Sequence, residues 1–322
     1  MSEPLILAAP SKGRAKEQVD AWLADCGLDL QVDGGARGYL ARLKGAPQVQ
    51  VRLLSASDIA EALEAGDVHL GVTGEDLLRE RKDVEKRVLL LRPLGFARAD
   101  VVVAVPRSWL DVETMFDLEE VTHNYMARTG RRMRVATKYV TQTRAFFARH
   151  GVADYRITES GGATEGAPAS GAAELIVDIT TTGATLAANG LKVLSDGLIL
   201  RSQFHLAAGL RASWTANQLA VAESLLRIIE ARAAAKTSAT LIWPGDQGGA
   251  DLAIEQLLAR GASRRPNGLL VRADDIPMAA AHLTNAGLGP VTVSRPDFIF
   301  DTRCEAFGKL CGALKTGDGV KN

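Results

Sequence analysis

The sequence has little of what marks secreted, metal-binding or nucleic-acid-binding proteins. Three cysteines, Cys26, Cys304 and Cys311, occur in 322 residues and form no CxxC pair and no metal-ligand cluster, a pattern typical of reduced thiols in a cytoplasmic protein. Aromatic residues make up 5% of the chain, and 38 basic residues balance 38 acidic ones. The chain therefore lacks the stacking surfaces and the overall positive field that nucleic acid or an anionic membrane would require.

Targeting segments and familiar nucleotide motifs are missing as well. The opening MSEPLILAAPSKGR has an apolar run too short for a signal peptide and no basic segment before it. No stretch is apolar over the length that spans a bilayer. Neither GxxxxGK[ST] nor a GxGxxG after a strand occurs, which disfavours P-loop nucleotidases and dinucleotide binding. We expect a cytoplasmic protein whose affinity for any phosphorylated ligand is local.

What the chain does contain is alternation of apolar strand-like segments with helical patterns, which predicts an α/β fold with a largely parallel sheet. Residues 5–10 (LILAAP) read as a first strand, and residues 215–236 have the spacing of a helix with one buried face. Residues 107–130 read as a polar, helical excursion outside the core. After a linker candidate at 233–238, a strand–helix–strand–helix–strand pattern predicts a small separate α+β domain.

The segment ELIVDITTTGATL offers the strongest chemical signal. A buried strand ends in Asp178, and the turn after it is rich in hydroxyls and in free backbone N–H groups. Gly183 can adopt a φ that other residues avoid, and the helix that follows adds its positive N-terminal end. This pattern predicts a nest for a phosphate monoester, with Asp178 accepting hydrogen bonds from the hydroxyls of a sugar; the alternative is a threonine-rich connection that Asp178 caps. The predicted nest comprises Thr180, Thr181, Thr182, Gly183, Ala184 and Thr185.

The same segment resembles a phosphoribosyl-pyrophosphate (PRPP) loop. Purine and orotate phosphoribosyltransferases have two adjacent acids before this loop, whereas here Ile179 follows Asp178. The single acid resembles ATP phosphoribosyltransferase, and the likeness extends in order over about residues 5–230. The other segments that carry it are PSKGR (10–14), DVHLGVTGEDLL (67–78), RVATKYVTQTRAFF (134–147), SGGATEGAP (160–168) and TTGATLAANGLKVL (181–194).

The resemblance implies two α/β lobes around a cleft, like a type II periplasmic binding protein, and a small C-terminal domain that is ferredoxin-like or a variant. It divides the chain into lobe I (1–98 plus 188–232), lobe II (99–187) and a regulatory domain (237–322). The closing strand of that last domain is hard to find after CEAFGKLCGAL. Residues 107–130 are longer than this family usually needs there.

The implied reaction joins adenine N1 of ATP to C1 of the PRPP ribose and expels pyrophosphate, the first step of histidine biosynthesis. The loop would fix the 5′-phosphate and Asp178 the ribose, with Arg14 as the second catalytic residue. Mg²⁺ would arrive on the PRPP diphosphate, because that ion prefers substrate oxygens and water. The resemblance further implies a homo-oligomer, a dimer or hexamer, and possible inhibition by histidine.

Five residues complete the predicted nucleotide and pyrophosphate site, each with a plainer alternative. Lys12 and Arg14 would neutralise phosphates across the cleft, or they are two solvated charges at a helix start. Glu165 would hold adenine or ribose, or it occupies a helix N-terminus where acids are favoured. Gly71 and Thr73 would line the cleft from lobe I, or they belong to a plain tight turn.

Two other functions stay open at this point. The two-lobed fold is also that of modules that bind a solute or effector without consuming it, and a base-salvage phosphoribosyltransferase would use a similar loop. An enzyme of the ATP type forms pyrophosphate from ATP and PRPP, whereas a binding module does not. The single acid before the loop disfavours the salvage enzyme.

Overall fold

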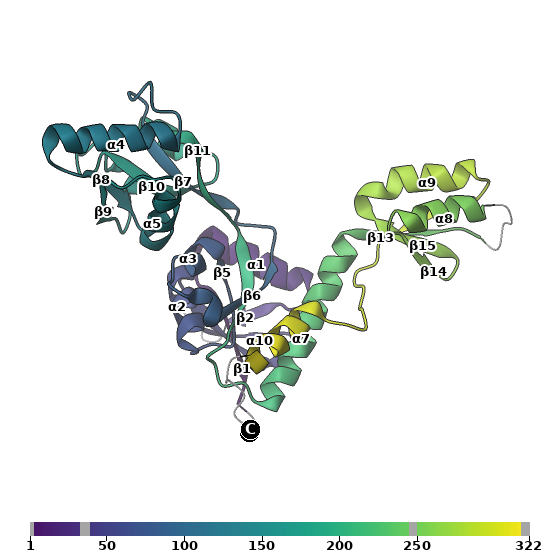
Figure 1. Ribbon diagram of the computed structural model, residues 1–322. Coiled ribbons are helices and arrows are strands. Elements are labelled where there is room, and N and C mark those ends of the chain that lie inside the picture. The colour runs from purple at the N-terminus through teal and green to yellow at the C-terminus, as the bar shows by residue number, and fades with distance from the viewer. Residues whose placement is uncertain (1–2, 33–38, 245–249, 317–322) are drawn as a thin grey trace.

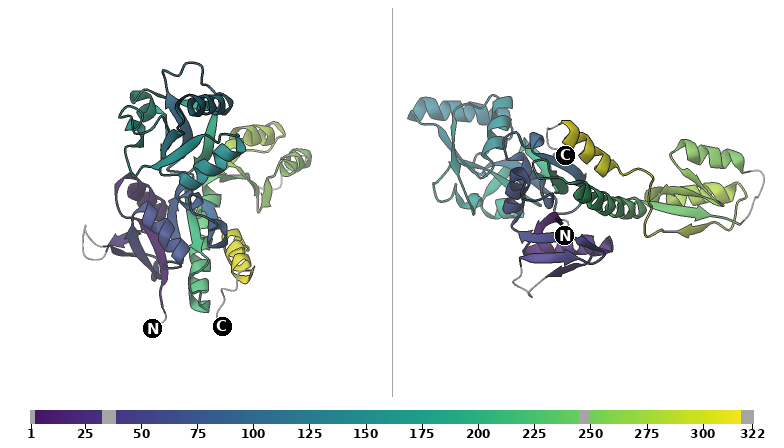
Figure 2. Two further views of the ribbon diagram at one scale, coloured as in Figure 1. Left: turned by 60° about the vertical axis from the view of Figure 1, so that its left-hand side comes forward. Right: turned by 90° about the horizontal axis from the view of Figure 1, so that it is seen from below.

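The computed structural model describes residues 3–32, 39–244 and 250–316, and in these ranges the chain forms three bodies, each built on its own β-sheet (Figure 1). Lobe I and lobe II lie next to each other, and the C-terminal body stands apart at the end of a long helix (Figure 2). None of the helices in these ranges combines the length and the apolarity that crossing a membrane demands.

Lobe I is a seven-stranded sheet with the order β2-β3-β4-β1-β5-β12-β6. Strand β1 lies at its centre because nearly every residue of LILAAP is apolar and buried, and it pairs in parallel with β4 and β5. The elements are β1 (Leu5–Pro10), α1 (Gly13–Asp25), β2 (Leu30–Val32), β3 (Leu40–Leu43), β4 (Ala46–Leu54), α2 (Ala56–Ala65), β5 (Leu70–Gly74), α3 (Glu75–Arg79), η1 (Val84–Lys86), β6 (Val88–Pro93) and β12 (Phe204–Gly209).

Lobe II is a five-stranded sheet with the order β11-β7-β10-β8-β9. The prediction that 107–130 is an excursion is wrong, because Val112, Met115 and Leu118 are buried in the lobe II core. Thr114 and Asp117 cap the helix in that segment reciprocally, which fixes its start. The elements are β7 (Ala99–Pro106), α4 (Met115–Thr129), β8 (Met133–Thr137), α5 (Val140–Arg149), β9 (Tyr155–Glu159), η2 (Thr164–Gly166), β10 (Leu175–Thr180), α6 (Ala184–Ala188) and β11 (Leu191–Ser202).

The two lobes repeat one strand order. Lobe I contains β4-β1-β5-β12-β6 and lobe II contains β9-β8-β10-β7-β11. In each, three parallel strands are followed by an antiparallel strand, β12 or β7, that enters from the other lobe. The predicted two-lobed α/β fold is therefore confirmed. The predicted lobe boundary differs at β11, which pairs with β7, so the chain rejoins lobe I only at β12.

The C-terminal body has a four-stranded antiparallel sheet with the order β14-β15-β13-β16. Its strands and helices follow each other as β–α–β–β–α–β, so the predicted domain is ferredoxin-like. The last strand of the predicted pattern is β16, which closes the sheet, and the strand that the pattern lacks is β14. The prediction that the closing strand follows CEAFGKLCGAL is wrong, because β16 precedes that segment. The elements are β13 (Ser238–Ile242), α8 (Asp251–Ala259), β14 (Ser263–Arg265), β15 (Gly268–Arg272), η3 (Ala273–Asp275), α9 (Ile276–Asn285) and β16 (Thr292–Ser294).

Two helices connect this body to lobe I. Helix α7 (Ala216–Lys236) runs from lobe I to β13, and α10 (Glu305–Thr316) returns to lie beside α7 (Figure 1). Leu310 and Leu314 of α10 belong to the lobe I core. The Glu230 carboxylate of α7 accepts hydrogen bonds from the first two amides of α10, at 3.0 and 2.8 Å. The predicted C-terminal domain of 237–322 therefore differs from the structure, because α10 packs on lobe I.

Candidate functional site

The predicted phosphate nest lies at the carboxyl end of β10. Asp178 and the threonines after it line a cavity of 320 Å³ together with Glu165, which η2 brings in from a separate segment. Sequence reasoning had singled out Asp178 and Glu165 on different grounds, and the structure brings them to one cavity. The threonines that line the cavity are Thr180, Thr181, Thr182 and Thr185, and the lining is completed by Ala99, Ile179 and Leu186.

The turn itself is shaped by its own side chains. Gly183 has φ +75°, and no atom lies within 4 Å of the place where a Cβ would sit. The Thr180 hydroxyl accepts the amide of Gly183 at 2.9 Å, and the Thr182 hydroxyl accepts that of Ala184 at 3.4 Å. Within the described ranges, the amides of Thr181 and Thr182 have no acceptor. The threonines therefore hold the turn in shape, and donors remain for an anion.

Asp178 is a half-buried carboxylate whose charge is poorly compensated. Burial raises the pKa of Asp178, the Ile179 amide at 2.8 Å and the nearby Lys138 ammonium oppose that rise, and the negative charge of Glu165 adds to it. Sequence reasoning missed Lys138, although it lies within the quoted segment RVATKYVTQTRAFF. It follows the end of β8, the strand next to β10.

The predicted cations of lobe I lie at the corresponding place in their own sheet. Lys12 is the N-cap residue of α1 and precedes Gly13, which has φ +68°. Lys12 and Arg14 are exposed at the carboxyl end of β1. The carboxyl ends of β5 and β8 meet where Tyr139 contacts Asp76. Because β1 neighbours β5 and β10 neighbours β8, both predicted turns flank this junction between the lobes.

Gly71 and Thr73 have packing contacts instead of an open face. Thr73 is 0% exposed, and its hydroxyl donates to the Ala56 carbonyl at 2.8 Å. A Cβ on Gly71 would lie 2.9 Å from the Ile59 side chain, so the missing side chain lets α2 approach β5. Their predicted contact with the nucleotide is not supported, because these features hold α2 on the sheet.

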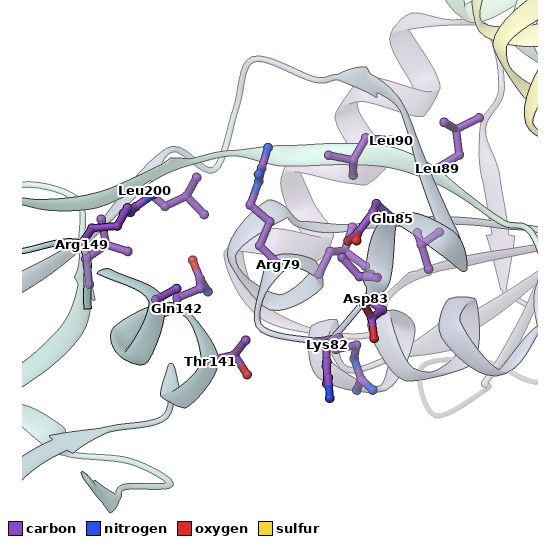
Figure 3. Close-up of a pocket in the computed structure, with 16 residues that line it drawn as sticks. Arg79, Lys82, Asp83, Glu85, Leu89, Leu90, Thr141, Gln142, Arg149 and Leu200 are labelled. Atoms are coloured by element: carbon purple, nitrogen blue, oxygen red, sulfur yellow. The ribbon is translucent and has the colours of Figure 1, made fainter. Parts of the chain in front are cut away.

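A second groove of 610 Å³ lies between the lobes, away from the phosphate turn. Figure 3 shows Thr141 and Gln142 of α5 on one side, with Arg79 and Lys82 of lobe I opposite. Thr141 and Gln142 also form hydrogen bonds with residues of lobe I. Within the described ranges, no three acidic, histidine or cysteine side chains gather as metal ligands.

Comparison with known proteins gives the same result at three levels. The HisG family, described as ATP phosphoribosyltransferase, matches residues 55–231. The ATP phosphoribosyltransferase of Caulobacter vibrioides (strain NA1000 / CB15N) is 63% identical over 318 residues, 98% of this chain and 99% of that protein. That of Rhodopseudomonas palustris (strain BisA53) is 59% identical over 236 residues, 73% of each chain. A chain of the ATP phosphoribosyl transferase (HisG:HisZ) complex from Thermotoga maritima superimposes with a TM-score of 0.53 at 26% identity, covering 70% of this chain and 98% of that one.

Proposed function

The chain belongs to the ATP phosphoribosyltransferase family, and we propose that the turns at the junction of its two lobes carry out that reaction. The enzyme joins N1 of the adenine of ATP to C1 of the ribose of PRPP and releases pyrophosphate, the first step of histidine biosynthesis. The observation that carries the residue assignment is the cavity that Asp178, the threonine turn and Glu165 line together.

In this proposal lobe II holds PRPP. The turn 180–185 receives the 5′-phosphate, since its free amides and the start of α6 favour a compact dianion. Asp178 accepts hydrogen bonds from the ribose hydroxyls and favours the positive charge that develops on the ring as the diphosphate departs. Glu165, on the wall of the same cavity, orients the ribose or the adenine.

Lobe I supplies positive charge in this proposal. Lys12 and Arg14 lie at the end of β1 and would neutralise the phosphates of ATP and the departing pyrophosphate, with Arg14 nearest the reaction. Lys138 joins them from lobe II, since its charge lies close enough to Asp178 to oppose the rise that burial causes in the pKa of that carboxyl. Mg²⁺ enters as part of the Mg–PRPP substrate, held by the diphosphate oxygens and water.

Adenine N1 already has an in-plane lone pair, so the reaction needs no protein base to create the nucleophile. Catalysis then depends on holding two substrates in line and on stabilising charge. A site made of amides, hydroxyls, one carboxylate and a few cations fits that requirement. A solute-binding module and a base-salvage enzyme are not favoured by the family membership.

We also propose that the C-terminal body is the place of regulation. Its ferredoxin-like fold is the one expected for a domain that binds histidine, and the chain continues from it into α10 on lobe I. Assembly into a homodimer or hexamer and a cytoplasmic location are part of the same proposal. Histidine titrated into the assay, with the oligomeric state followed by light scattering, tests these points separately.

The decisive experiment combines purified protein, ATP, PRPP and Mg²⁺. The expected result is pyrophosphate release together with a new purine absorbance, each dependent on both substrates. Omitting PRPP or replacing ATP by hypoxanthine is the control, since a salvage enzyme would accept the free base. Binding of PRPP without any pyrophosphate would instead point to the solute-binding alternative and would overturn the proposed function.

A further inference from the structure

A buried polar cluster joins the two lobes beside the proposed site. The Asp76 carboxylate, on α3 of lobe I, accepts the Tyr139 hydroxyl of lobe II at 2.8 Å. Its other oxygen accepts the hydroxyl of Ser202, the last residue of the crossing strand β11, also at 2.8 Å. Asp76 is 6% exposed and Tyr139 0%. One carboxylate of lobe I thus binds lobe II at two places, the Tyr139 hydroxyl and the last residue of β11.

Further hydrogen bonds between the lobes lie at the start of α5. The Tyr139 side chain provides no cap for this helix. Glu80 of lobe I instead accepts the amides of Thr141 and Gln142, at 2.6 and 3.2 Å. The Gln142 side-chain amide donates to the Asp76 carbonyl at 2.9 Å. A helix of lobe II is therefore capped by a residue of lobe I, and the two capped residues, Thr141 and Gln142, also line the groove in Figure 3.

The shape of this junction also explains one glycine. A Cβ on Gly74 would lie 2.3 Å from Oδ1 of Asp76, although the backbone there, with φ −71°, would accept any residue. The missing side chain therefore leaves room for the Asp76 carboxylate, which a larger residue at this position would displace. This observation is independent of the hydrogen bonds and shows that the position of the Asp76 side chain is built into the fold.

A buried carboxylate at position 76 is an inefficient way to stabilise the contact between the lobes. Within the described ranges Asp76 has no cationic partner, and an apolar contact of the same size would avoid the desolvation of a carboxylate. Two neutral donors, the hydroxyls of Tyr139 and Ser202, compensate the carboxylate and fix its direction. Burial, and then the charge of Asp76, raise the pKa of Tyr139 far above its usual range, so the hydroxyl stays a donor.

The cluster is linked to the proposed site through one peptide bond. Lys138 immediately precedes Tyr139, and its ammonium lies 4.9 Å from the centre of the Tyr139 ring. The charge of Lys138 also acts on Asp178. A rotation of lobe II that pulled Tyr139 from Asp76 would therefore move Lys138, together with the rest of lobe II, relative to the lobe I residues of the proposed site.

We propose that Asp76, Tyr139 and Glu80 form an interlobe clamp, and that Tyr139 is a positioning residue that fixes the lobe angle at which Lys138 and the two substrate turns face each other. This inference rests on the proposed function for the kinetic consequence only. The mechanical part, that the clamp sets the lobe angle, stands on the contacts themselves.

Two variants test the clamp from opposite directions. Tyr139→Phe removes one hydroxyl and keeps the ring beneath Lys138, whereas Gly74→Ala pushes a methyl group against the Asp76 carboxylate. We expect each to lower kcat/KM for PRPP about tenfold, the usual size for losing a hydrogen bond to a charged group. Tyr155→Phe is the matched control, since its ring packs on Phe147 inside lobe II.

The lobe angle is measured without turnover. Spin labels at Glu17→Cys on α1 and Glu120→Cys on α4, both exposed, report the interlobe distance in a Cys311→Ser background, since Cys26 and Cys304 are buried. The parent and Tyr155→Phe should give one narrow distribution, and Tyr139→Phe and Gly74→Ala a broadened or displaced one. Circular dichroism verifies that each protein is folded.

Both readouts must change together. A normal distance distribution in the two clamp variants overturns the proposal, whatever their kinetics. A broadened distribution with unaltered kcat/KM overturns the positioning role of Tyr139. If the parent protein itself released no pyrophosphate, the proposed function would fail, and the distance measurement would still decide whether Tyr139 holds the lobes.

Discussion

The turn at residues 10–14 of lobe I and the turn at 180–185 of lobe II have similar backbone conformations but different side chains. Each follows a central strand, β1 or β10, and each places a glycine with positive φ, Gly13 at +68° and Gly183 at +75°, at the start of a helix. Lobe I adds two exposed cations, whereas lobe II adds hydroxyls and one half-buried acid. In the proposed function, turns with the same backbone conformation bind two different ligands.

The difference follows from how charge is distributed on the substrates. A triphosphate or pyrophosphate spreads charge over several atoms, and long cationic side chains can follow it. A single phosphate on a sugar is compact, so short hydroxyls and fixed amides suit it, and in the proposed function the neighbouring acid binds the hydroxyls of the neutral ribose. Loss of lobe II groups should therefore cost more than loss of lobe I groups, because fixed groups have no substitute nearby.

The largest effect expected from any single change is that of Asp178→Asn. The amide still accepts from Ile179 but lacks the charge that stabilises the reacting ribose, so kcat should fall about 100-fold or more. Steady-state kinetics with both substrates measures it. Asp154→Asn is the control, since Asp154 contacts the exposed His123 at 3.2 Å in the same lobe. An Asp178→Asn protein with parental turnover would remove the distinction between the two turns.

The same variant, Asp178→Asn, is expected to be more stable than the parent protein near neutral pH. The pKa of Asp178 is raised in the folded protein, so ionising this group costs stability above its ordinary pKa, and that cost disappears in acid where the group is protonated in both states. Asp178→Asn should therefore raise Tm near neutral pH, with the gain vanishing as the pH falls through the folded pKa. Thermal melts over a pH series give the answer; a gain that grows in acid contradicts the assignment.

Next in size comes a paired test of the two glycines. Alanine at Gly13 or Gly183 meets no neighbouring atom within 4 Å, so its cost, about 1–2 kcal/mol, comes from the left-handed backbone alone. We expect Gly183→Ala to raise KM for PRPP and Gly13→Ala to raise KM for ATP, each about tenfold. Gly312→Ala in α10, with no positive φ, is the control. Equal effects of both variants on one substrate would show that the turns are not specialised.

A smaller effect is expected at the cations. Lys12→Met keeps the length of an exposed side chain and removes one charge from a solvated site, so KM for ATP should rise a few-fold, and the difference should shrink at high salt. Lys86→Met, also exposed, serves as the control. Kinetics at two ionic strengths decides: a salt-independent change would mean that Lys12 acts through packing.

The smallest kinetic effect is expected at the far end of α1. The hydrogen bond from Arg232, together with Lys236, lowers the pKa of Asp25 to about 2 despite partial burial. Asp25→Asn should cost about 2 kcal/mol at neutral pH, a difference that is lost as the pH falls from about 4 through 2. Urea unfolding at several pH values measures it. Altered KM values would show that the lobe I turn depends on the contact between the far end of α1 and α7.

The sequence was informative where the residues of the candidate site lie next to each other in the chain. The threonine turn, its glycine and its acid form one continuous segment, so their pattern could be read without a structure. Glu165 came only from resemblance, and the structure independently brings it to the same cavity. The βαββαβ domain was predicted incompletely because β14 has three residues, all exposed, and so carries no alternation of buried and exposed positions.

Long-range contacts account for what sequence reasoning missed. Nothing in the amphipathic pattern of α10 says that lobe I covers its apolar face, and nothing in β11 says that it pairs with β7. Thr73 looked like a site hydroxyl, whereas the fold uses it to bind the Ala56 carbonyl. The contact between Asp76 and Tyr139 joins residues 63 positions apart, a pairing that depends on how the lobes close.

The return of the chain through α10 changes the mechanics of the C-terminal body. Arg227 and Arg232 of α7 donate to carbonyls of Asp297, Asp301 and Thr302, so the returning segment is fastened along the helix before α10 begins. A domain that is attached through one helix can rotate about the axis of that helix. Here the body is attached through α7 and through the segment that returns to α10, and two connections that are bonded to each other resist such rotation. A displacement of the C-terminal body would therefore reach lobe I by bending α7 and the returning segment together.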